Sequence, residues 1–120
     1  MQPDKRNAAY LFDMLEAAEK IQRYIAGKNF TDFITDELLR DAVERNIEII
    51  GEAARRISDS LKQEHPEIPW SKIIAQRNVL IHEYDDIDLE EIWEVASSHI
   101  PRLMNLIKEI MPPLPPEEET

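Results

Sequence analysis

The apolar residues of this chain recur every three to four positions along most of its length, which is the spacing of one buried face of an α-helix. The first stripe predicts a helix from near Asp4 to Gly27, since glycine commonly ends a helix. Residues 28–34 are expected to form a connector in which Phe30 and Phe33 turn inward. The pattern thus begins with one long helix and a short, partly apolar link.

A second stripe predicts a helix from about Asp36 to about Glu64, with Thr35 as its N-cap. Asn46 interrupts the apolar face of this helix. Two interpretations are open for this residue. It is either a hydrogen-bonded residue of the core or of a dimer interface, or a polar group that faces a functional site, and its spacing favours the first.

Residues 65–69 contain two prolines, and the residue before a proline is disfavoured in a helix. A third helix is therefore expected to begin at residue 70 or 71 and to end in the acidic turn 85–88. Asp88 can cap a fourth helix. Because the apolar spacing continues in phase past Pro101, this helix is expected to bend there rather than end.

Four helices with short connections favour an all-α fold, an antiparallel four-helix bundle with room for a short extra helix. The length of 120 residues suits one domain, which we expect to span residues 1–111. Residues 112–120 are rich in proline and then acidic, and we expect them to form a disordered tail.

The net charge of −11 limits the kinds of partner. A protein that binds nucleic acid over a broad surface is typically basic, so any such site here should be a small local cleft, whereas a basic protein partner would suit the charge. The absence of cysteine excludes disulfides and thiolate metal sites. No apolar run approaches the ~20 residues that cross a membrane, and a cytoplasmic location is expected.

The candidate chemistry lies in the third predicted helix. On a regular helix, one face contains Arg77 together with Trp70, Ile73, Ile74, Leu80, Ile81 and Tyr84. A guanidinium within an apolar face must be paired, extend to the solvent at the edge of that face, or line a polar cleft, because an unpaired buried charge is costly. Arg77 could therefore form a structural ion pair with Glu48 or Glu52, or it could serve a functional site.

His82 lies about 140° around an ideal helix from Arg77, so one regular helix would direct the two side chains apart. They could meet if the helix loosens near its end, if the long Arg77 side chain reaches around, or if a second chain supplies the other half. Histidine suits acid–base chemistry near neutral pH, although a lone histidine is more often structural. Tyr84 shares the face of Arg77, either as a packed aromatic residue or as a functional group.

The pattern Arg77-Asn78-x-x-x-His82-x-Tyr84 resembles the R-x4-6-H motif of the HEPN superfamily and, in its R-x4-H-x-Y form, the HepT-like toxins. Residues 47–54, IEIIGEAA, are similar to the segment that precedes the motif in that family, and residues 88–93, DLEEIW, to the segment that follows it. The bare R-x4-H pattern is common by chance, whereas three segments in the family's order are specific.

The resemblance implies a helical homodimer that acts as a metal-independent endoribonuclease without a cofactor, with RNA as its substrate. It implies that Arg77 and His82 are catalytic and that Asn78 supports them. It further implies a toxin of a toxin–antitoxin pair, whose antitoxin is a minimal nucleotidyltransferase that transfers AMP to Tyr84. A two-fold dimer would bring two copies of each catalytic residue into one cleft. The alternative, which the acidic charge favours, is a non-catalytic binding partner of the nucleotidyltransferase.

Overall fold

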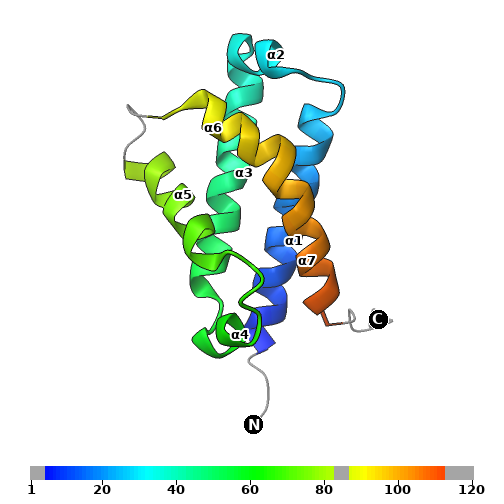
Figure 1. Cartoon of the computed structure of the whole chain (residues 1–120), viewed down its shortest axis with the longest axis vertical. Coiled ribbons are helices and arrows are strands. Elements are labelled where there is room, and N and C mark those ends of the chain that lie inside the picture. Colours follow the sequence, from blue (N-terminus) through cyan, green and yellow to red (C-terminus); the bar gives the residue numbers. More distant parts are fainter. Residues whose placement is uncertain (1–4, 83–86, 113–120) are drawn as a thin grey trace, which may run out of the picture.

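Long helices run alternately up and down in the computed structural model, which describes residues 5–82 and 87–112 (Figure 1). The long elements are α1 (Lys5–Ile25), α3 (Glu37–Arg56), α5 (Trp70–His82) and a last arm made of α6 (Leu89–Glu94), a π-helical turn (Val95–His99) and α7 (Ile100–Ile110). α1 packs against α3 and the last arm, and α5 packs against α3. The prediction of an all-α antiparallel bundle is confirmed, and none of the described helices is long and apolar enough to cross a membrane.

The core lies where α1, α3 and the last arm meet. Its fully buried side chains include Met14, Ile21, Val43 and Ile107. Phe33 is also fully buried and packs against Trp93, with ring centroids 5.4 Å apart at an angle of 41°. Phe30 is half-buried against the same core. Both phenylalanines therefore turn inward, as their position predicted.

The link after α1 contains a helix that the apolar spacing did not predict. α2 (Phe30–Thr35) has Asn29 as its N-cap, and Asn29 forms a capping box with Asp32. The prediction of Thr35 as the next N-cap was wrong, because Thr35 is the last residue of α2. Asp36 caps α3 instead, with its carboxylate accepting a backbone N–H hydrogen bond at 3.1 Å.

The preceding helix, α1, ends at Ile25, two residues before the predicted end. Gly27 follows with a φ of +74°, the left-handed conformation that glycine adopts without strain after a helix. The glycine therefore follows the end of the helix, as expected, but it lies two residues beyond the last helical residue rather than at the helix end itself.

The helix predicted over residues 36–64 is two helices, because α3 ends at Arg56 and α4 (Asp59–Glu64) begins anew. Ser58 caps α4 by accepting a hydrogen bond from the Leu61 backbone N–H at 3.3 Å. The buried Asn7 side chain donates to the Ser58 hydroxyl at 2.9 Å and accepts from its backbone N–H at 3.0 Å. The residue at the break therefore contacts α1, which local periodicity does not show.

The last arm begins as predicted, with the Asp88 carboxylate accepting hydrogen bonds from two backbone N–H groups in the first turn of α6. The helix does not end at Pro101. It passes through the π-helical turn that ends two residues before the proline, a wider turn in a segment where the proline supplies no N–H and crowds the carbonyl four residues back. Residues 113–120 lie outside the described range, so the prediction of a disordered tail and the domain limits stay predictions.

Candidate functional site

The side chain of Arg77 begins against the backbone of Gly51, where α5 packs on α3. A methyl group at Gly51 would lie 2.2 Å from the Arg77 Cβ and 2.8 Å from its Cγ. It would also lie 3.2 Å from the Ile73 carbonyl oxygen. The two helices can therefore approach this closely because residue 51 has no side chain.

Arg77 is paired with one of the two acids that the sequence suggested. Its Nη2 lies 3.0 Å from Oε2 of Glu52, while its Nη1 donates to the Asn78 side-chain oxygen at 2.9 Å. Glu48 pairs instead with Arg45, at 3.3 Å. The Arg77 Nε is buried without a hydrogen-bond partner among the described residues, and the side chain is only 19% exposed. The guanidinium is thus held in place but not fully satisfied.

Glu52 is shared by three arginines. Its Oε1 accepts hydrogen bonds from Arg55 Nη2 and Arg56 Nε, each at 3.0 Å, in addition to the contact of its Oε2 with Arg77. The Arg55 hydrogen bond lowers the pKa of Glu52 most and the Arg56 hydrogen bond next, and with the charges of Arg55 and Arg77 they bring it to about 2. The carboxylate is therefore ionised at neutral pH, and the cluster has a net charge of +2.

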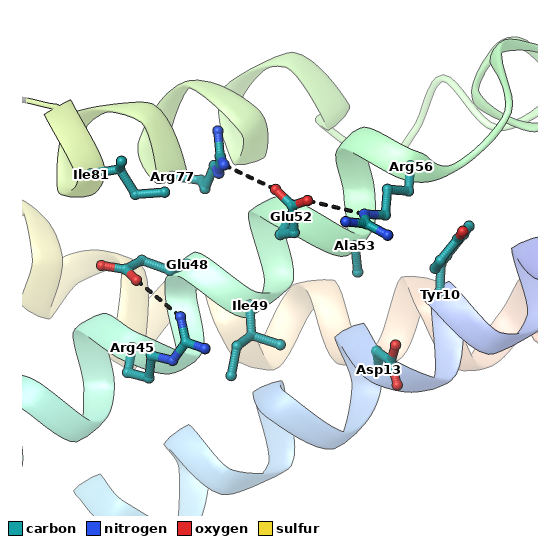
Figure 2. Close-up of a pocket in the computed structure, with 10 residues that line it drawn as sticks. All are labelled: Tyr10, Asp13, Arg45, Glu48, Ile49, Glu52, Ala53, Arg56, Arg77 and Ile81. Carbon is teal, nitrogen blue, oxygen red and sulfur yellow. Dashed lines mark hydrogen bonds and ion pairs between the residues drawn. The ribbon is translucent and has the colours of Figure 1, made fainter.

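Glu52, Arg56 and Arg77 line a groove of about 370 Å³ between α1, α3 and α5 (Figure 2), and Arg55 is not among its lining residues. Arg56 lies between Glu52 and Tyr10, and its pKa is raised first by the hydrogen bond to Glu52 and then by the one with Tyr10. The lining residues are Tyr10, Asp13, Arg45, Glu48, Ile49, Glu52, Ala53, Arg56, Arg77 and Ile81. The groove therefore has a mixed polar and apolar lining, in which three arginines are matched by three acids.

Within one chain, only some of the other motif residues lie close to Arg77. Asn78 is exposed and contacts Arg77 through the hydrogen bond described above. His82 is the last residue of α5, its side chain is exposed, and it does not line the groove. Tyr84 lies outside the described residues. One chain thus brings Arg77 and Asn78 together but leaves His82 apart, as the angle around the helix predicted.

Asn46 and the two histidines outside the motif, His65 and His99, have structural or exposed positions. Asn46 is buried and donates to the Ala42 carbonyl at 2.8 Å, which confirms its interpretation as a hydrogen-bonded core residue. His65 lies 3.1 Å from Glu67, and His99 is exposed on the last arm. Among residues 5–82 and 87–112, no three acids or histidines are grouped so that they could hold a metal ion.

A second cavity, of about 460 Å³, lies between α3, α5 and the last arm. Its walls are largely apolar, with Ile47, Ile73 and Val79 among the lining residues. None of Arg77, Asn78 and His82 lines it. The polar candidate site therefore lies on the other side of α5, in the groove that contains Arg77.

Sequence reasoning missed the roles of Gly51, Arg56 and Tyr10. The spacing of Glu52 and Arg56, four residues apart on one helix, could have indicated their ion pair. The approach of Gly51 to Arg77 and of Tyr10 to Arg56 joins different helices, so no local pattern could have shown either contact.

Comparison with known proteins agrees with the motif. A family model described as "Ribonuclease HepT-like" matches residues 14–110. A protein of Methanocaldococcus jannaschii, provisionally named an RNase, is 35% identical over 95 residues, which cover 79% of this chain and 87% of the relative. A protein of Caldanaerobacter subterraneus subsp. tengcongensis, also provisionally named an RNase, is 36% identical over 102 residues, covering 85% and 91%.

A third relative, named as a probable ribonuclease HepT of Thermococcus cleftensis, is 40% identical over 94 residues, covering 78% of this chain and 86% of its own. No solved structure matches the chain. The family model covers most of the chain and these relatives are covered nearly end to end. The chain belongs to the HepT-like ribonuclease family.

Proposed function

We propose that this protein is an endoribonuclease that acts as the toxin of a toxin–antitoxin pair, with Arg77 and His82 as its catalytic residues. The observation that carries the proposal is the guanidinium of Arg77. It is largely buried and lines a polar groove, and its Nε has no hydrogen-bond partner in the described part of a chain that belongs to the HepT-like ribonuclease family. A purely structural arginine would more commonly have all its nitrogens satisfied.

The residue types suit RNA cleavage without a metal ion. The reaction removes the proton of a 2′-hydroxyl, forms a new bond from that oxygen to phosphorus, and protonates the leaving 5′-oxygen. His82 would take or give a proton at these oxygens. Arg77 would stabilise the charge that develops on the phosphoryl oxygens, with Asn78 orienting its Nη1.

We further propose that the active unit is a homodimer. His82 ends α5 with an exposed side chain, and it does not line the groove that contains Arg77. If two copies meet along α5 and the neighbouring part of α3, His82 of one copy can face Arg77 of the other. The dimer would also supply two copies of each residue, which suits a reaction that needs both an acid and a base.

The proposed neutralisation is transfer of AMP to Tyr84 by a minimal nucleotidyltransferase. Tyr84 lies two residues after His82 in the sequence, so AMP on its hydroxyl would add bulk and a phosphate beside the catalytic residues. The intact mass of the protein, purified with and without co-expression of the nucleotidyltransferase, tests this step. We expect AMP additions that map to Tyr84 and disappear in Tyr84→Phe; additions at another residue would contradict it.

Substitution of each catalytic residue tests the ribonuclease assignment. Arg77→Ala and His82→Ala should each lower RNA cleavage by about 100-fold or more, because each removes charge stabilisation or proton transfer in the transition state. Growth arrest should be lost in parallel. Arg102→Ala is the matched control, since Arg102 is exposed on α7 and lies outside the groove.

Circular dichroism and thermal unfolding would establish that both variants keep the fold. Wild-type toxicity and cleavage in both would contradict the assignment of the active site. A wild-type protein that binds the nucleotidyltransferase but cleaves no RNA would favour the non-catalytic alternative.

A further inference from the structure

We propose that Arg56 is a substrate-binding residue, which holds a backbone phosphate of the RNA next to the phosphate at Arg77. The inference rests on the proposed ribonuclease function and extends it along the groove. It assigns a role to a residue outside the R-x4-H-x-Y motif, on a different helix.

The geometry places Arg56 and Arg77 on the two oxygens of one carboxylate. The Nε of Arg56 donates to Oε1 of Glu52 at 3.0 Å, and the Nη2 of Arg77 lies 3.0 Å from Oε2. Both arginines line the same groove, one from α3 and one from α5 (Figure 2). Glu52 thereby lies between the two guanidinium groups and contacts one through each of its oxygens.

The two arginines differ in exposure in a way that suits different tasks. The side chain of Arg77 is 19% exposed, whereas that of Arg56 is 56% exposed. The deeper guanidinium suits a reacting phosphate that must be shielded from water. The more exposed guanidinium, that of Arg56, suits the adjacent phosphate of an RNA single strand that runs along the groove.

The chemistry of the two guanidinium groups also suits a phosphate ligand. Three arginines contact the single carboxylate of Glu52, and two of them, Arg56 and Arg77, line the groove. Over its whole lining the groove is balanced, because Arg45, Arg56 and Arg77 are matched by Asp13, Glu48 and Glu52. The guanidinium fork matches the geometry of phosphate oxygens, so the attraction comes from local contacts at the two arginines rather than from the charge of the groove.

The test measures binding of a fluorescent single-stranded RNA in a His82→Ala background, which prevents cleavage. We expect Arg56→Ala to weaken binding about tenfold, since a charged hydrogen bond to phosphate is lost. The slope of log affinity against log salt concentration should fall by about 0.7, the value for one phosphate contact on a single strand. Arg56→Lys should retain that slope because it keeps the charge.

Arg55→Ala is the matched control. It removes the same charge and the same kind of contact with Glu52, but Arg55 does not line the groove. It should weaken binding clearly less than Arg56→Ala. Equal losses in the two variants would mean that Arg56 acts only through Glu52, and would overturn the inference.

Cleavage kinetics in the otherwise wild-type protein separate this inference from the proposed function. We expect Arg56→Ala to raise KM while kcat stays within a small factor of wild type. Wild-type KM and salt dependence in this variant, with an active parent protein, would overturn the phosphate site alone. A parent protein that neither binds nor cleaves RNA would overturn both proposals.

Discussion

At the scale of single residues, the ion pair of Arg77 shows that a structural contact and a functional role need not exclude each other. Sequence spacing left Arg77 as either a partner of Glu48 or Glu52 or a group at a functional site. It is paired with Glu52 and also lines the groove with its Nε unsatisfied by the described part of the chain. The pairing offsets part of the cost of burying the guanidinium.

Glu52 should give the protein a pH-dependent contribution to stability. Its folded pKa of about 2 lies below the ordinary value of 4.5, so the contribution is fully present above pH 4.5 and is lost as the pH falls towards 2. Glu52→Gln should therefore lower the free energy of unfolding at pH 7 by about 1 kcal/mol, the scale of a few partly exposed ion pairs. The difference in the free energy of unfolding between the variant and the wild type should shrink as the pH falls from 4.5 towards 2.

Urea unfolding of both proteins at pH 7, 5, 4 and 3 measures that difference. Gln resembles the protonated acid, so the two curves should converge at low pH. A difference that stays constant across this range would show that the charge of Glu52 is not what stabilises the cluster.

At the scale of helices, the packing of α5 on α3 depends on Gly51. The glycine lies in a stretch that otherwise favours helix, where it has a lower helix propensity than alanine. Its use is tertiary, since the Arg77 Cβ occupies the space that a side chain would need. The same contact sets where the Arg77 side chain enters the groove.

Gly51→Ala should force α5 away from α3 and lower stability by about 1–3 kcal/mol, as overpacking does. It should also reduce RNA cleavage at temperatures where the variant remains folded, because Arg77 moves with the helix. Gly27→Ala is a matched control: its φ of +74° makes alanine cost about 1–2 kcal/mol, but nothing lies within 4 Å of the added methyl. Full activity in Gly51→Ala would contradict the positioning role.

At the scale of the whole molecule, the fold separates two residues that the proposed chemistry needs together. Arg77 faces α3 and the groove, whereas His82 is exposed at the end of α5. The proposed dimer resolves this separation if the catalytic pair forms between chains. A site formed between two chains can be distinguished from a site within one chain by combining two inactive variants.

A mixed dimer of Arg77→Ala and His82→Ala chains should recover activity. One of its two sites would then combine an intact Arg77 from one chain with an intact His82 from the other, giving about half of the wild-type rate. Two affinity tags would isolate the mixed dimer after co-expression, with each variant homodimer as control. An inactive mixed dimer would place both residues in the same chain, and a monomeric wild-type protein would contradict the dimer itself.

The sequence by itself determined the helical class, the start of α5 near residue 70, the Asp88 cap of α6 and the R-x4-H-x-Y motif of the family. Each follows from local rules, because helix periodicity, caps and motifs depend on residues within a few positions of one another. It also indicated that Arg77 would be paired, reach the edge of its apolar face or line a polar cleft, since the cost of an unpaired buried charge holds for any fold.

Only the tertiary structure decided which acid pairs with Arg77, where the long second helix breaks, and which side chains share the groove. The Asn7–Ser58 contact at the break between α3 and α4 joins residues 51 positions apart. The approach of Gly51 to Arg77 likewise joins two helices. These contacts depend on how helices pack, and packing is set by the shapes of distant surfaces that periodicity within one helix does not encode.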